Sequence, residues 1–141
     1  MGQLNNLIRK YESINVEEAV RVAFLKNQEN YIELNLSQML EGLTSKGTEI
    51  GQYQSELYAI EKNRINPLPG FGVVDLRYTG AFYGATTLSL KGDTIIIQSV
   101  DSKAPKLEGK YGIEIWGLMD NNRVLFIIDF LKPELVKQLG I

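Results

Sequence analysis

A long run of apolar residues at helical spacing, beginning at Val16, is the feature that most constrains the fold. Neither glycine nor proline interrupts this run until Gly42. Asn15 stands three residues before Glu18, a capping-box spacing that indicates a helix start, and Gly47 is a suitable C-terminal stop. The pattern predicts one helix of about 28–30 residues, which is roughly 45 Å long. A domain of 141 residues has a radius of gyration of about 14 Å, so this helix would line a whole side of it or project beyond it.

Shorter helices are predicted on both sides of this run. Residues 4–11 carry apolar side chains at helical spacing, and residues 52–64 repeat the pattern. The only stretch rich in proline and glycine, residues 66–72, indicates a loop. Pro133 suits the first turn of a closing helix that ends at Gly140.

Beyond residue 72 the apolar period changes, which favours strands. Residues 86–90 and 94–98 resemble two strands joined by a glycine-containing turn, a hairpin signal. Residues 122–131 leave two alternatives open, because Asp120 could cap a helix there but the segment is rich in strand formers. Shorter elements are predicted as an extended segment over 73–76, a helical turn over 81–83, a helical turn over 105–109 and a strand over 113–116.

These elements predict one α+β domain that spans residues 1–141. Residues 1–66 form its helical part, and residues 67–141 form a β-rich part that ends in the closing helix. In this arrangement the long N-terminal helix packs on a small, mostly antiparallel sheet.

The composition argues against most kinds of catalysis. The chain has no histidine and no cysteine, so it lacks the usual general base, thiolate nucleophiles and zinc–sulfur sites. Its 15 Lys and Arg residues against 17 Asp and Glu residues offer no basic excess of the kind that phosphate backbones require. We therefore expect no enzyme activity, no metal or cofactor and no direct sequence-specific binding of nucleic acid. The first residues lack a signal peptide's basic and apolar regions, so we expect cytoplasmic synthesis and no membrane insertion.

Two further sets of residues have a spacing or chemistry that could form a chemical site. Gly42 and Gly47 have a spacing like that of a phosphate loop, but no lysine follows the second glycine, and a helix end explains both. The carboxylates of Asp75, Glu108 and Glu114 could in principle supply an acid and a base, as in a small glycosidase. A solvated or salt-bridged role for them is the favoured interpretation.

The order of features between residues 73 and 118 is similar to that of a viral protein family. A segment with Thr79-Gly80 followed by Phe82 is succeeded by the hairpin, and then by Leu107-Glu108-Gly109 close to a tyrosine. This order resembles small tail-completion and neck proteins of tailed bacteriophages, in particular those of crAss-like and other phages of Bacteroidetes. The resemblance implies an α+β fold and a hexameric or dodecameric ring at the head–tail junction, with portal or tail-tube subunits as neighbours.

The leading hypothesis is therefore a virion structural protein of the phage neck or tail. The alternative is a small bacterial protein-binding adaptor that uses the same aromatic side chains for one partner. Under the leading hypothesis, Gln38→Lys should weaken assembly and leave the folded monomer intact. The predicted subunit contacts are Leu34, Asn35 and Gln38 on the long helix, together with Tyr78, Phe82 and Tyr83.

Overall fold

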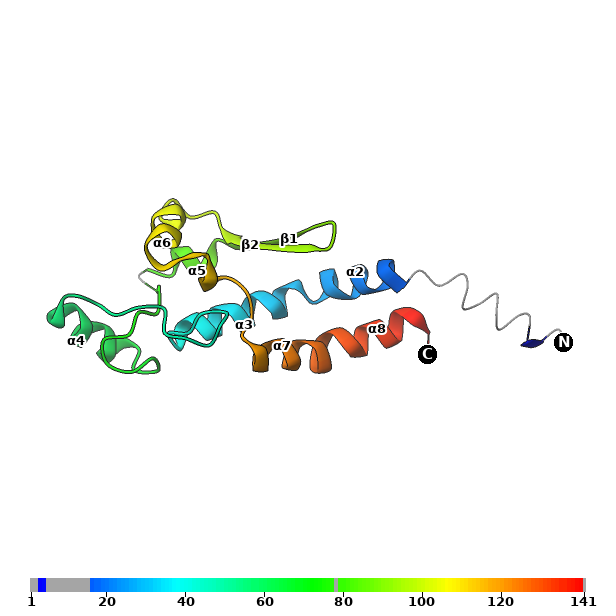
Figure 1. Cartoon of the computed structure of the whole chain (residues 1–141), viewed down its shortest axis with the longest axis horizontal. Coiled ribbons are helices and arrows are strands. Elements are labelled where there is room, and N and C mark those ends of the chain that lie inside the picture. Colours follow the sequence, from blue (N-terminus) through cyan, green and yellow to red (C-terminus); the bar gives the residue numbers. More distant parts are fainter. Residues whose placement is uncertain (1–2, 5–15, 78, 141) are drawn as a thin grey trace.

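Two antiparallel helical segments define the long axis of the molecule (Figure 1). The computed structural model describes residues 3–4, 16–77 and 79–140, so Asn15 and most of the helix expected over 4–11 lie outside the described residues. The two segments lie side by side, since α2 contacts α8 and α3 contacts α7. They consist of α2 (Val16–Lys26) and α3 (Gln28–Leu40), and of α7 (Asp120–Phe126), a π-helical turn η2 (Ile127–Leu131) and α8 (Lys132–Leu139).

The prediction of one long N-terminal helix is wrong, because the chain forms two helices interrupted at Asn27. The Asn27 backbone leaves the helical region, with φ −112° and ψ 17°. Its N–H bonds to the Phe24 carbonyl at 2.9 Å, and its side-chain Nδ2 donates to the Ala23 carbonyl at 3.0 Å. The same Nδ2 also lies 3.3 Å from the Phe130 carbonyl. The asparagine side chain thus replaces a lost helical bond and ties the break to the returning segment.

Residues 122–131, where the sequence left helix and strand open, are helical. Packing against α2 and α3 overrides the strand propensity of this segment. The π-helical turn η2 comes just before Pro133, whose ring would clash with the carbonyl four residues back in a regular helix. The wider turn, in which the Lys132 N–H bonds to the Ile127 carbonyl, accommodates the proline. Gly140, with φ 69°, ends α8 as predicted.

The sheet formed by the described residues is a two-stranded antiparallel hairpin of β1 (Thr86–Lys91) and β2 (Thr94–Ser99). Lys91 pairs with Thr94, which leaves Gly92-Asp93 as the two-residue turn. This confirms the predicted hairpin and its small antiparallel sheet. The hairpin lies over the α2–α3 segment (Figure 1), with β1 in contact with α3.

The helical turns predicted around the hairpin are present, but the strand expected over 113–116 is not. That segment forms a 3₁₀ turn, η1 (Ile113–Ile115), directly after α6 (Ala104–Tyr111). Before the hairpin, α5 (Ala81–Gly84) begins where the Ala81 N–H bonds to the Thr79 hydroxyl oxygen. Among the described residues beyond 67, helical residues therefore outnumber strand residues, and this part is not β-rich as expected.

The helix α4 (Glu56–Ile65) stands at one end of the molecule (Figure 1). It starts later than predicted because the Ser55 Oγ accepts the N–H of Tyr58 at 3.3 Å and caps the first turn. Extended segments connect α4 to the rest, with a β-bridge between Gln52 and Val73.

The interior consists of two adjoining apolar clusters. The first surrounds Met39 and Ile115, both fully buried. The second is built on Phe24, Leu118 and Phe126. Tyr31 and Leu88 contact both clusters, so the core is continuous along the molecule. No helix within the described part of the chain has the length and apolarity needed to cross a membrane.

Candidate functional site

Asn35 and Gln38, predicted to contact neighbouring subunits, are instead buried within the chain itself. Their exposed fractions are 0% and 1%. Asn35 donates to the Ile115 carbonyl at 3.0 Å and accepts the Gly117 N–H at 2.8 Å. Gln38 donates to the Gly117 carbonyl at 2.9 Å and accepts the Met119 N–H at 2.9 Å. The two amides bind backbone N–H and carbonyl groups of residues 115–119, as a neighbouring β-strand would. We call this arrangement the amide clamp.

The amide clamp corrects the expected behaviour of Gln38→Lys. A lysine at this position would place its ammonium group beside the backbone N–H of Met119. Both groups are hydrogen-bond donors, so neither would satisfy the other. The lysine would also leave the Met119 N–H and the Gly117 carbonyl without their amide partners. The change should therefore unfold the chain rather than weaken assembly alone. Asn35 and Gln38 lie off the main apolar stripe because they bind backbone, not because they face outward.

The three other predicted contact residues that the structure describes lie in or near the core. Phe82 is buried and its ring centroid lies 5.4 Å from that of Trp116. Tyr83 is half-buried and its hydroxyl donates to the Asp75 carbonyl. Leu34 is half-buried against the second cluster, and Tyr78 lies outside the described residues. The structure thus brings Phe82 and the amide clamp to the same segment, residues 115–119, in the interior.

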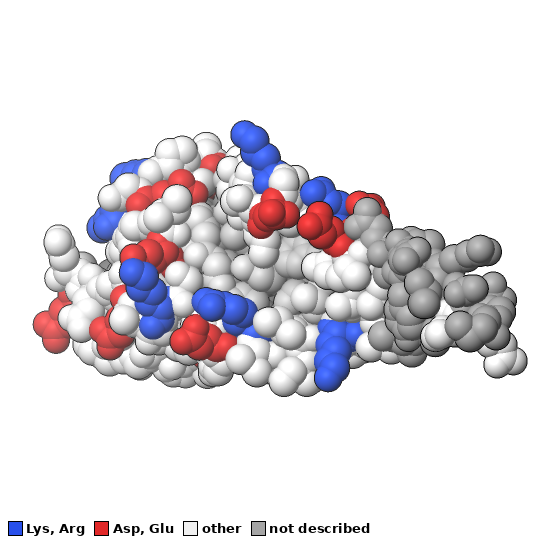
Figure 2. Space-filling view, turned by 45° about the vertical axis from the view of Figure 1, so that its right-hand side comes forward, with Lys and Arg blue, Asp and Glu red and all other residues white. Residues whose placement is uncertain are grey.

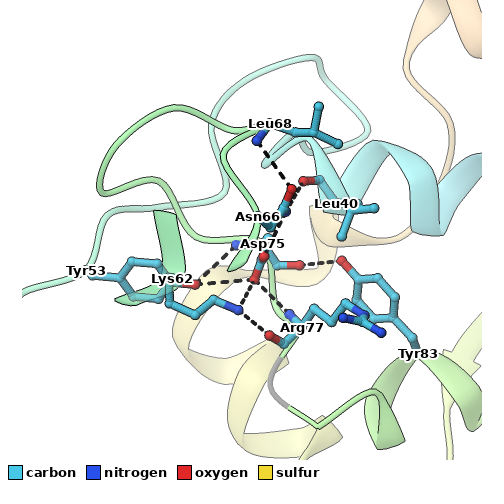
Figure 3. Close-up of polar contacts among 8 residues, drawn as sticks. All are labelled: Leu40, Tyr53, Lys62, Asn66, Leu68, Asp75, Arg77 and Tyr83. Atoms are coloured by element: carbon cyan, nitrogen blue, oxygen red, sulfur yellow. Dashed lines mark hydrogen bonds and ion pairs between the residues drawn. The ribbon is translucent and has the colours of Figure 1, made fainter. Parts of the chain in front are cut away.

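A second polar centre surrounds Asp75, which is 2% exposed (Figure 3). Its Oδ1 lies 2.8 Å from the Lys62 Nζ and accepts the Arg77 N–H at 2.9 Å. The Tyr53 hydroxyl, at 3.3 Å, donates to the same oxygen. Its Oδ2 accepts the Asn66 Nδ2 at 3.0 Å. Both carboxylate oxygens are therefore filled by donors, which is what a buried charge requires.

The partners of Asp75 join segments that are distant in the sequence. Asn66 also donates to the Leu40 carbonyl at 2.8 Å, at the end of α3. Lys62 also donates to the Arg77 carbonyl. Together they fix the extended segment that contains Leu76, a buried residue with φ +61°. A non-glycine residue in that region costs about 1–2 kcal/mol, so the network holds a conformation that the backbone disfavours.

The Asp75 centre cross-links the segments that carry its hydrogen-bond and ion-pair partners. Burial, and then the charge of Asp75, raise the pKa of Tyr53 and of Tyr83 above the usual tyrosine range, so both remain neutral donors. Each of the three carboxylates considered from the sequence has its own partner. Glu108 accepts the Trp116 indole N–H at 2.8 Å, and Glu114 pairs with Lys46 at 2.9 Å.

Metal binding has no support within the described part of the chain, since no three acidic side chains there are grouped to hold an ion. Every buried polar side-chain atom of the described residues also has a hydrogen-bond partner.

Large apolar side chains are exposed on two separate helical surfaces. Leu57 and Ile60 are apolar positions of the helix predicted over 52–64, yet Leu57 is 81% exposed, and Ala59 and Lys62 are the buried residues of α4. Nothing in the local sequence indicates this inversion, in which Lys62 turns inward and pairs with Asp75 at 2.8 Å. We define the α4 face as Leu57, Ile60, Ile65, Leu68 and Phe71, and the α7 face as Val124, Leu125, Ile127 and Ile128.

Charged side chains do not gather on the face shown in Figure 2. Lysine and arginine alternate with aspartate and glutamate there, with uncharged surface between them. This agrees with the even distribution of charge along the sequence.

Comparison of the chain with protein-family models, with curated proteins and with solved structures found no match.

Proposed function

We propose that this chain is a structural subunit that acts by binding further copies of itself. The observation that carries the proposal is the pair of uncovered apolar faces. The α7 face consists of four exposed side chains of α7 and η2, and the α4 face consists of three exposed side chains of α4 together with Leu68 and Phe71 of the loop that follows it. Monomeric soluble proteins rarely leave contiguous apolar surface of this kind in water. Covering one leucine or isoleucine side chain contributes about 1.5–3 kcal/mol, so a few such residues suffice for association.

The two faces lie on different elements, which favours head-to-tail contacts. In Figure 1, α4 stands at one end of the molecule, whereas α7 belongs to the helical segment along one long side. An interface between two different faces is heterologous, and repeating it produces a closed ring or an open filament. A two-fold dimer would need only one of the two faces.

The biological setting that we propose is the virion of a tailed bacteriophage. The chain would form a completion or adaptor ring of the neck or tail, at the head–tail junction, with portal or tail-tube subunits as neighbours. The resemblance of residues 73–118 to neck and tail-completion proteins supports this setting, and the uncovered faces support self-assembly. The protein would be made in the cytoplasm of the host bacterium and act without catalysis.

Native mass spectrometry of the purified protein across about a hundredfold range of concentration tests the proposal. A discrete six- or twelve-subunit species is expected. A monomer at every concentration would contradict self-assembly in solution and favour the alternative, a small bacterial adaptor for a different partner.

Two charge-introducing variants separate a head-to-tail interface from a symmetric one. Ile60→Glu disables the α4 face and Ile128→Glu disables the α7 face, so each protein alone should be monomeric. Mixed in equal amounts, they should form a heterodimer and nothing larger, because each retains the face that the other has lost. Val100→Glu is the matched control. Val100 is exposed but belongs to neither face, so its variant should assemble normally. Failure of the mixture to associate would exclude contact between these two faces.

A further inference from the structure

A concave cleft opens between α6 and the segment that leads into α4. Its volume is about 500 Å³, within the range of about 300–1,000 Å³ that is usual for small-molecule sites. The charged side chains that line it, among the described residues, are all cationic: Lys62, Arg77, Lys103, Lys106 and Lys110. No carboxylate of this described lining faces them in the cleft. This uniform charge is unusual in a chain whose net charge is −2.

The cationic side of the cleft follows from the sequence of α6. Lys103, Lys106 and Lys110 are three and four residues apart, so they lie on one side of the helix. Leu107 and Tyr111 share that side and also line the cleft. Asp75 neutralises Lys62. Within the described part of the chain, by contrast, no carboxylate lies within 4.0 Å of the cationic groups of Arg77, Lys106 and Lys110.

The opposite side of the cleft is aromatic and amide-bearing. Tyr53 and Tyr58 pack edge to face with centroids 4.9 Å apart, and Phe82 and Leu76 contribute apolar lining. A ligand that fits this surface needs a planar or apolar body for the tyrosines. It also needs more than one negative charge for the lysines, which act on phosphate as point charges.

We propose that this cleft binds a phosphate-bearing organic anion with a planar body, the chemistry of a nucleotide. The size of the cleft favours a free nucleotide over a long strand, because the cations are gathered in one concavity. The same chemistry is offered by one nucleotide unit of a single strand, so the experiment separates these two sources. The site is independent of the proposed assembly, since neither Lys106 nor Lys110 belongs to the α4 face or the α7 face.

Isothermal titration calorimetry with ADP, adenosine and pyrophosphate tests the proposal on the full chain. ADP should bind, and adenosine should bind at least about tenfold more weakly because it lacks the phosphates. Raising NaCl from about 50 mM to about 300 mM should weaken ADP binding, since the lysines are exposed to solvent. The double variant Lys106→Glu/Lys110→Glu should weaken ADP at least about tenfold. Tyr58→Ala should weaken ADP and leave pyrophosphate unchanged.

Lys132→Glu is the matched control, because this lysine lies on α8 outside the cleft, and its variant should bind ADP normally. Circular dichroism confirms that each variant is folded. Competition of ADP with a thymidine decanucleotide at this site would identify a strand as the source of the nucleotide and would uphold the proposal. Absence of ADP binding at about 10 mM, binding that the double variant leaves unchanged, or binding of hexaglutamate in place of ADP would each overturn it.

Discussion

Asn35→Ala should remove about 2–6 kcal/mol from the free energy of unfolding. The substitution leaves the Ile115 carbonyl and the Gly117 N–H without the bonds of 3.0 Å and 2.8 Å that they make to Asn35. Because the position is fully buried, each unpaired group costs about 1–3 kcal/mol. A small domain has a total stability of about 5–15 kcal/mol, so the loss is a large share of it.

Urea unfolding followed by tryptophan fluorescence measures this loss. Trp116 is the only tryptophan, and it lies between the two backbone groups in question. With a slope of about 1.5 kcal/mol/M the midpoint should fall by about 1–4 M. The measurement belongs at a protein concentration where the chain is monomeric, since association would add apparent stability.

Ser37→Ala is the matched control for Asn35→Ala. Ser37 lies on the same helix and is exposed, so both variants gain the helix propensity of alanine while only one loses buried bonds. The control should change the stability by less than about 0.5 kcal/mol. A loss below about 1 kcal/mol for Asn35→Ala would refute the reasoning, because it would mean that the two backbone groups find other partners.

Two further predictions concern the network of Asp75 and the loop after α3. Burial and the charge of Asp75 raise the pKa of Tyr83, so the folded chain keeps this proton above about pH 10, where the unfolded chain loses it. Stability is therefore present below about pH 10 and falls as the pH rises further, and Tyr83→Phe should make that decline shallower by up to about 1.4 kcal/mol per pH unit in urea titrations. Gly42→Ala should cost about 1–3 kcal/mol more than Gly47→Ala, because both have positive φ but only the Cβ at Gly42 would lie 2.7 Å from the Val73 Cγ1. Equal thermal stability of the two alanine variants would contradict the steric argument.

The elements that sequence predicted correctly depend on short-range rules. The turn at Gly92-Asp93 and the stop at Gly140 require only particular backbone angles, which neighbouring residues signal. The break at Asn27 depends partly on the Phe130 carbonyl, far along the chain, and nothing in the local apolar period reveals it. The apolar period alone therefore predicts a helix that is longer than either helix that forms.

The surface positions predicted for Asn35 and Gln38 are wrong for the same physical reason. The sequence predicts Asn35 and Gln38 at the surface, because polar side chains off an apolar stripe usually face water. Their partners lie in residues 115–119, about eighty positions away, so their burial could not be inferred without the fold. Lys62 is a similar case, since its inward position depends on Asp75.

The inverted orientation of α4 is the observation that links the fold to assembly. A helix of a lone soluble domain would turn Leu57 and Ile60 inward, whereas here Lys62 takes the inward position. A buried ion pair contributes little net stability compared with apolar packing of similar volume, so folding of the isolated chain does not account for this choice. The proposed covering of the α4 face by a further copy of the chain would account for it, because the apolar side chains would then contribute at the interface. It follows that Ile60→Glu should abolish association and leave the stability of the monomer nearly unchanged, whereas loss of the amide clamp should unfold the monomer itself.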